Sequence, residues 1–155
     1  MLNRGYSRTF KDKNPSYENV SVCSGWFDYC EFLEWYENQP NGDGWQLDKD
    51  LIKKGNQIYS PDHCCILPIE INSLLKNRSA DRGKYPVGVY YREKYNNYQS
   101  GGGVYLGVYS TPEEAFNVYK EWKENKLLTL SRKYSNILDG KVIEAMKVYK
   151  IEITD

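Results

Sequence analysis

The sequence lacks several features that define common classes of protein. It has one histidine, His63, and shows no secretory leader, no long apolar run and no repeat of about 20–50 residues. We therefore expect a soluble, intracellular protein whose thiols stay reduced. Its formal net charge is zero, which argues against a uniformly basic nucleic-acid coat protein.

The four cysteines do not form a recognisable disulfide framework. They are Cys23, Cys30, Cys64 and Cys65, and the last two are adjacent. Cys23, Cys30, Cys64 and His63 could converge on zinc, but the spacing lacks a CxxC pair. The simpler expectation for all four thiols is that they are small buried apolar groups.

What the chain has in abundance is aromatic residues and an uneven distribution of charge. It contains 15 Tyr and 4 Trp, a composition that favours wet, partly exposed contact surfaces. Residues 18–50 hold eight acids against one base, whereas residues 76–94 hold six bases against two acids. This asymmetry indicates two faces with different partners, or two solvated surfaces whose charges cancel.

The first half of the chain predicts short mixed elements. Residues 1–17 show no clear period and are interpreted as an arm. Apolar spacing predicts a helix over Ser24–Asn38, which the turn cluster Pro40–Gly44 ends. Two short strands, Trp45–Ile52 and Gln57–Ser60, are expected to form a hairpin at Gly55-Asn56, and Pro68 is placed to start a helix.

The second half carries the sharpest local signals. A basic connector over 77–85 leads to three expected strands, Val87–Glu93, Tyr95–Ser100 and Val104–Tyr109. Thr111-Pro112-Glu113-Glu114 forms a capping box for a helix through Lys126 that could continue towards Tyr134. Asp139 is placed to cap a last helix over Lys141–Tyr149, and Ile151–Thr154 could form a terminal strand.

Three stretches of this second half resemble a known family. Gly88-Val89-Tyr90-Tyr91, Tyr105-Leu106-Gly107-Val108-Tyr109 and Glu113-Glu114-Ala115-Phe116 look like the Apetala-type (ethylene-response) DNA-binding domain, which also occurs in phage HNH homing endonucleases. Upstream, Val22–Phe27, Leu47–Asp50, Gly55-Asn56, Tyr59–Pro61 and Ile71-Asn72 resemble the core of such nucleases and the segment before it. The resemblance covers nearly the whole chain.

The resemblance implies a fold class and a division of the chain. The expected class is α+β, with a small degenerate ββα-metal (HNH-like) module, then a three-stranded antiparallel sheet packed on one helix, and a C-terminal helix. The expected parts are an HNH-like module over 1–76, a basic connector over 77–85, a DNA-binding-like domain over 86–126 and a helical extension over 127–155.

The nuclease-like half departs from the family pattern at its centre. By position, Asp48 is the metal-side acid, Lys49 occupies the general-base position and Asn72 lies on the helix, with Asp50 as a further candidate. A lysine near its ordinary pKa of about 10.4 is charged at neutral pH and cannot accept a proton. Asp48, Asp50 and Asn72 could still hold Mg²⁺, so a magnesium-dependent nicking enzyme stays open beside the favoured expectation of lost cleavage.

The resemblance implies that the sheet contacts double-stranded DNA. Alternation places Val87, Val89 and Tyr91 on one face and Tyr90, Arg92 and Lys94 on the other. The residues expected to contact DNA are Arg78, Arg82, Lys84, Tyr90, Arg92, Lys94, Tyr98, Gln99 and Tyr105. Gly101-Gly102-Gly103 falls where relatives usually carry basic residues, which weakens the strand and the expectation of base reading.

Three functions follow from these features. The first is a phage-encoded DNA-binding protein in the host cytoplasm, related to HNH homing endonucleases, that needs no cofactor for binding. The second is an anti-defence protein, such as an anti-CRISPR, whose acidic segment 18–50 blocks a host nuclease. The third is the live nicking enzyme. A tyrosine-rich sheet that binds protein, or nothing, is the plain alternative to a DNA-binding role.

Overall fold

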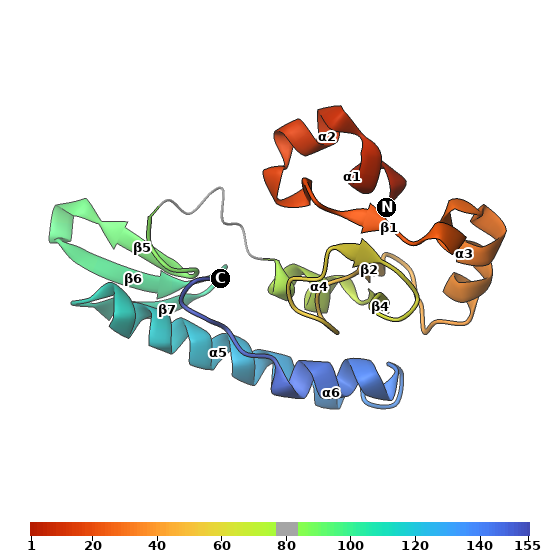
Figure 1. Cartoon of the computed structure of the whole chain (residues 1–155). Coiled ribbons are helices and arrows are strands. Elements are labelled where there is room, and N and C mark those ends of the chain that lie inside the picture. Colours follow the sequence, from red (N-terminus) through yellow and green to blue (C-terminus); the bar gives the residue numbers. More distant parts are fainter. Residues whose placement is uncertain (77–83) are drawn as a thin grey trace. The chain divides into compact units, whose positions relative to one another are not determined.

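The computed structural model describes residues 1–76 and 84–155 and is a mixed α+β structure with small sheets and several helices (Figure 1). The chain forms two compact units. The N-terminal unit comprises Met1–Ser73 with Tyr134–Ala145, and the sheet unit comprises Leu74–Lys133 with Met146–Asp155. The α+β class is therefore confirmed at this level. Most of the expected basic connector lies outside the described residues.

The N-terminal stretch, which was interpreted as an arm with no clear period, forms short helices. It forms α1 (Leu2–Tyr6), α2 (Arg8–Lys13) and a single 3-10 turn, η1 (Pro15–Tyr17). The Ser7 hydroxyl accepts the Phe10 backbone N–H at 3.3 Å and caps α2. Helices this short carry too few turns to show a period, and packing against the rest of the unit stabilises them.

The aromatic segment after the arm is divided in two. A 3-10 turn, η2 (Ser24–Phe27), precedes α3 (Tyr29–Glu37), where one continuous helix was expected. Asp28 separates them: its backbone is extended and its carboxylate accepts the Cys30 N–H at 2.7 Å. Asp28 is thus the N-cap of α3, and the helix cannot continue through it.

Four very short strands lie in the N-terminal unit. β1 (Ser21–Val22) pairs in parallel with β3 (Ile58–Tyr59), and β2 (Gln46–Asp48) pairs antiparallel with β4 (Cys65–Leu67). The expected hairpin between the second and third of these is therefore wrong. β4 was not anticipated because all three of its residues are buried and show no alternation. The helix predicted after Pro68 is present as α4 (Ile69–Leu75).

One hydrophobic cluster of the N-terminal unit gathers residues from separate elements. Its buried members are Val20, Val22, Trp26, Tyr59 and Cys64. The rings of Phe32 and Trp35 on α3 pack against Trp26, with centroids 5.2 and 4.6 Å from it. This packing attaches α3 to the strands and leaves its other side to solvent.

The sheet unit matches its prediction closely. β5 (Val89–Arg92), β6 (Asn97–Gly101) and β7 (Tyr105–Tyr109) form an antiparallel sheet in sequence order, and a 3-10 turn, η4 (Glu93–Tyr95), lies between the first two. α5 (Pro112–Lys133) runs along one face of the sheet (Figure 1). The capping box is confirmed: the Glu114 N–H reaches the Thr111 hydroxyl, and the Glu114 carboxylate accepts the Thr111 N–H, each at 3.2 Å.

The glycines of the sheet make room for one aromatic ring of α5. A Cβ at Gly88 would lie 2.2 Å from Cγ of Tyr119, and a Cβ at Gly102 would lie 2.6 Å from its Cε2. Tyr119 is buried in the core of the sheet unit beside Val89 and Phe116. The glycine run therefore does more than leave side chains off the sheet, because it lets the helix approach the strands closely.

The C-terminal residues confirm one expectation and contradict another. Asp139 caps α6 (Gly140–Val148) by accepting the Lys141 N–H at 2.8 Å, as predicted. The expected strand Ile151–Thr154 is instead an irregular turn. Ile151 is fully buried in the core of the sheet unit, and its N–H donates to the Glu124 carboxylate at 3.0 Å. Its backbone is satisfied by a side chain, so it joins no strand.

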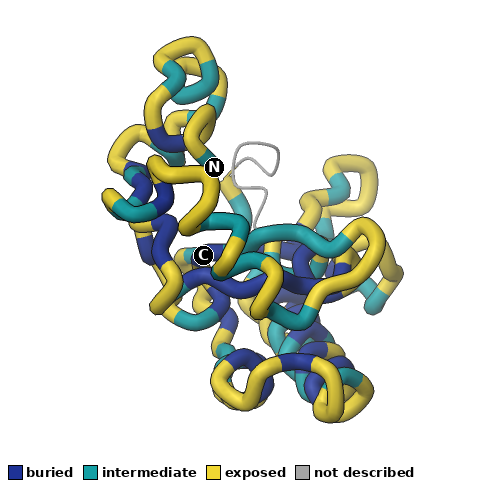
Figure 2. Tube along the Cα trace, turned by 90° about the vertical axis from the view of Figure 1, so that its right-hand side faces the viewer, coloured by how far each residue is buried: buried dark blue, intermediate teal, exposed yellow. Residues whose placement is uncertain are grey.

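Buried residues are unevenly spread along the chain (Figure 2): residues 64–68 are all buried, whereas residues 27–48 include no buried residue. Within the described ranges, 1–76 and 84–155, no helix has both the length and the apolar character needed to span a membrane.

Candidate functional site

The two faces of the three-stranded sheet differ in what covers them. Val89, Ser100 and Gly107 form one cross-strand row, and Val89 belongs to the core beneath α5. The neighbouring row is Tyr90, Gln99 and Val108, which must face the other way because successive strand residues alternate. Tyr90 is 51% exposed, so this second face, here called the open face, is open to solvent.

A bulge adds a second tyrosine to the open face. The register shifts between Ser100 and Gly101, so that Ser100 pairs with Gly107 but Gly101 pairs with Tyr105. The skipped residue, Leu106, packs against the core, whereas Tyr105 is 66% exposed. Tyr105 therefore lies on the same face as Gln99 and Tyr90.

The β5–β6 hairpin ends in a cluster of cations around an exposed ring. The guanidinium carbon of Arg92 lies 4.4 Å from the ring centroid of Tyr95, and the Lys94 ammonium lies 5.4 Å from it. Asn96 adopts a left-handed backbone (φ 47°) that turns the chain, and its side chain accepts the Tyr91 hydroxyl at 2.7 Å. Within residues 1–76 and 84–155, neither Arg92 nor Lys94 forms an ion pair, so both charges are available to a ligand.

Apart from Tyr98, the predicted DNA-contacting residues fall into three groups. The open face and hairpin end bring together Tyr90, Arg92, Lys94, Gln99 and Tyr105. Lys84 lies over Tyr85, with its ammonium 5.3 Å from the ring centroid. Arg78 and Arg82 lie outside the described residues.

Tyr98 was expected beside Gln99 on the open face, and that placement is wrong. It pairs with Tyr91 and Tyr109, and its ring contacts Tyr85 and Tyr91 at centroid distances of 5.4 and 5.2 Å. It also packs against the core under α5. Tyr98 and Gln99 are consecutive strand residues, so only one of them can face outward.

The loop that follows β2, residues 49–57, holds two of the residues that were expected at the nuclease site, Lys49 and Asp50. One carboxylate oxygen of Asp48 accepts the backbone N–H groups of Asp50 at 2.9 Å and Leu51 at 2.8 Å. Burial raises the pKa of Asp48, although these two hydrogen bonds act in the opposite direction. Asp48 thus stabilises the turn that begins the loop.

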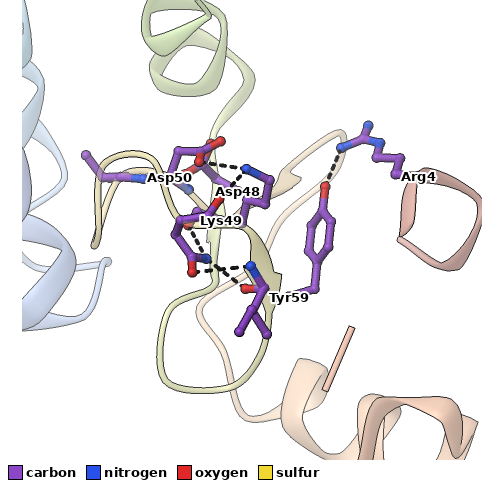
Figure 3. A network of polar contacts seen from close by, with 8 residues as sticks. Arg4, Asp48, Lys49, Asp50 and Tyr59 are labelled. Atoms are coloured by element: carbon purple, nitrogen blue, oxygen red, sulfur yellow. Dashed lines mark hydrogen bonds and ion pairs between the residues drawn. The ribbon is translucent and has the colours of Figure 1, made fainter. Parts of the chain in front are cut away.

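Lys49, at the predicted general-base position, is part of the loop's internal structure (Figure 3). Its ammonium donates to the Asp50 carboxylate and to the Asn56 carbonyl, each at 2.7 Å, and the residue is only 9% exposed. The Asn56 amide in turn donates to the carbonyls of Lys49 and Ile58. These side-chain bonds close the loop where a hairpin was expected.

The side chains that the resemblance implies as magnesium ligands each take part in other hydrogen bonds. The Asp50 carboxylate is engaged by Lys49, an Asp48 oxygen is engaged by two backbone N–H groups, and the Asn72 amide donates to Gln46 at 2.6 Å. Within the described part of the chain, no group of three or more His, Cys, Asp or Glu residues is arranged to hold a metal ion.

One contact at this loop could not be predicted from residue spacing. The Arg4 guanidinium on α1 donates to the Tyr59 hydroxyl at 3.2 Å (Figure 3). The Tyr17 ring lies between two cations, 6.0 Å from the Arg4 guanidinium carbon and 5.9 Å from the Lys49 ammonium. Burial raises the pKa of Tyr59 to about 12, so it stays a neutral acceptor. Only the packing of α1 against β1 brings Arg4 here.

The acids of segment 18–50 have divided roles. Glu18 pairs with Arg8 at 3.1 Å, Asp28 caps α3, and Asp48 and Asp50 stabilise the loop. Exposed carboxylates remain at Glu31, Glu34 and Glu37, three residues apart on α3, and at Asp43. The segment therefore presents fewer free carboxylates than its composition suggests.

Only two of the four cysteines are buried. Cys64 and Cys65 are buried, Cys23 is half-buried and Cys30 is exposed, so the expectation of burial is wrong for Cys30. The single histidine, His63, shares a hydrogen bond of 3.2 Å with the Ser60 hydroxyl.

Comparison of the chain with protein-family models, with curated proteins and with solved structures gives no match.

Proposed function

We propose that this chain is a phage-encoded DNA-binding protein, related to HNH homing endonucleases, that contacts double-stranded DNA through its sheet unit. The observation that carries the proposal is the hairpin end, where Arg92 and Lys94 lie over Tyr95 without any ion pair in the described residues. They adjoin an open face that includes Gln99, whose amide suits contacts to base edges.

The expected chemistry is contact with the DNA backbone. Lys84, Arg92 and Lys94 would each neutralise a phosphate and release a counterion. The logarithm of affinity should then fall against the logarithm of salt concentration with a slope of about −0.9 for each contact made. A Mg²⁺ ion is not needed for contacts of this kind.

The proposal includes weak or lost cleavage. It is supported by the Lys49 ammonium, which donates to Asp50 and Asn56 and has no free lone pair with which to activate water. Incubation with plasmid and Mg²⁺ or Mn²⁺, beside an Asp48→Ala control, tests this part. Nicking by the wild type that Asp48→Ala abolishes would show a live enzyme and contradict it.

Binding is tested with labelled duplexes at low and moderate salt. We expect an Arg92→Gln, Lys94→Gln double variant to bind more weakly and to lose about two units of salt slope. Lys126→Gln is the matched control, because Lys126 is an exposed cation of α5 in the same unit. Equal affinities and slopes for the double variant and the wild type would refute the proposed site.

A second candidate function is inhibition of a host defence nuclease, such as a CRISPR effector. The specific observation is the row of exposed carboxylates Glu31, Glu34 and Glu37 on α3, which could occupy a basic nucleic-acid channel. The test measures DNA cleavage by a purified defence nuclease with wild-type protein and with a variant carrying Gln at all three positions. Inhibition by the wild type and loss of inhibition in the variant would favour this function.

A further inference from the structure

The open face of the sheet is aromatic where a duplex reader would be charged. Neither β6 nor β7 contains a Lys, Arg, Asp or Glu residue. Direct readout of a duplex relies mainly on long polar side chains that reach base edges in the major groove. Here Gln99 is flanked instead by Tyr90 and Val108, and Tyr105 lies further along the sheet.

Two tyrosine rings of this face contribute little to the packing of the fold. The side chains of Tyr90 and Tyr105 form no hydrogen bond or ring contact within residues 1–76 and 84–155, and the two residues are 51% and 66% exposed. The other tyrosines of the sheet differ from them. Tyr91 donates to Asn96, Tyr98 packs on Tyr91, and Tyr109 donates to the Leu106 carbonyl. Two large exposed rings on one sheet face, the first of them two residues from the unpaired Arg92, indicate a ligand outside the fold.

From this arrangement we infer that the open face binds unpaired bases of DNA, which stack on Tyr90 and Tyr105. The inference rests on the proposed DNA-binding function and names the form of DNA that this site prefers. Base stacking on aromatic rings tolerates any sequence, because every base has a π face. It therefore does not need the charged base-reading side chains that β6 and β7 lack.

The spacing of the two rings suits a strand that crosses the sheet. Tyr90 is opposite Gln99 on β5, and Tyr105 is opposite Gly101 on β7, two residues further along β6. Standard sheet geometry then separates the two Cα atoms by roughly 12 Å. Arg92 is two residues from Tyr90 on β5, so the Tyr90 end of such a strand lies near the hairpin end, where Arg92 and Lys94 can contact its phosphates.

The experiment compares three DNAs of the same sequence, about 20 nucleotides long, to accommodate one site. They are a single strand, a duplex, and a duplex with a central unpaired bubble, each followed by fluorescence anisotropy at two salt concentrations. We expect the single strand and the bubble to bind at least about tenfold tighter than the duplex, because an unpaired base pays no unstacking cost.

Substitutions identify the rings. Tyr90→Ala and Tyr105→Ala should each weaken single-strand binding by about 5- to 150-fold, whereas the Phe variants should retain it because the ring remains. Tyr29→Ala is the matched control, since Tyr29 is 69% exposed but belongs to the N-terminal unit. Circular dichroism confirms that each variant folds.

Each outcome has a distinct meaning. A duplex bound as tightly as the bubble would overturn the inference and leave the proposed DNA-binding function standing. Binding to none of the three DNAs would overturn both. Phe variants as weak as the Ala variants would show that the hydroxyls, and not stacking, hold the ligand, and would also overturn the inference.

Discussion

The Tyr119 ring lies against Gly88 and Gly102 of the sheet unit, so we expect Gly102→Ala to lower the free energy of unfolding. The added Cβ would lie 2.6 Å from Cε2 of Tyr119, 3.4 Å from its hydroxyl oxygen and 3.5 Å from Cζ. The ring cannot move away freely, because it is buried and also lies against Gly88. Overpacking of this kind costs about 1–3 kcal/mol.

The same substitution should be harmless once the ring is gone. In a Tyr119→Leu background the three atoms that meet the new Cβ no longer exist, because leucine ends at Cδ. Replacing glycine with alanine where the backbone permits it stabilises a protein by about 0.4–1 kcal/mol through the unfolded chain. The double-mutant cycle should therefore show a coupling energy above about 1 kcal/mol.

The measurement is urea unfolding followed by circular dichroism, with hydrogen exchange of β6 and β7 amides to isolate the sheet unit. Gly103→Ala is the control: nothing lies within 4 Å of its Cβ, but its φ of +82° is strained for alanine. It should cost about 1–2 kcal/mol with or without Tyr119. A Gly102→Ala cost that is the same in both backgrounds would refute the close-approach argument.

Three further predictions concern the Ser100 hydroxyl, the Glu124 carboxylate and the cysteine thiols. The Ser100 hydroxyl is fully buried without a hydrogen-bond partner in the described residues, so Ser100→Ala should stabilise the sheet unit by about 1 kcal/mol in urea unfolding, and a loss of stability would contradict this. Desolvation raises the pKa of Glu124, but hydrogen bonds from Ile151, Lys120 and Lys150 outweigh it, so the net shift is down from 4.5. The resulting stability is present above pH 4.5 and is lost as pH falls through the lowered pKa, and Glu124→Gln should flatten that loss in unfolding curves recorded from pH 7 to pH 3. Burial raises the pKa of the Cys64 thiol to about 12 and that of Cys65 as well, so a thiol reagent should label Cys30 rapidly in the native protein and these two only on unfolding; rapid labelling of all four would refute their burial.

Local chemistry made the sheet and its helix predictable. The capping box at Thr111 fixes the start of α5 through bonds within four residues, and the turn of the hairpin is equally local. Signals of this kind do not depend on the rest of the chain, which is why they survive in the structure.

Long-range pairing was not predictable in the same way. No local pattern predicts that Asp48 pairs with Cys65. The loop between them is closed by side-chain hydrogen bonds between Lys49 and Asn56, which residue spacing does not reveal. The side of the sheet on which Tyr98 lies could not be predicted either, because strands with tyrosine on both sides show no alternation of apolar and polar residues. Arg4 reaches Tyr59 across 55 positions of sequence, and no spacing rule covers such a contact.

The burial of Ile151 has a practical consequence for work on the sheet unit in isolation. The sheet unit is discontinuous in sequence, because Met146–Asp155 belongs to it and Ile151 is part of its core. A fragment that ends with α5 would therefore expose the apolar contacts that Ile151 covers and leave the Glu124 carboxylate without its backbone donor. A recombinant version should rejoin the tail to α5 through a linker, and any affinity tag should avoid the C-terminus.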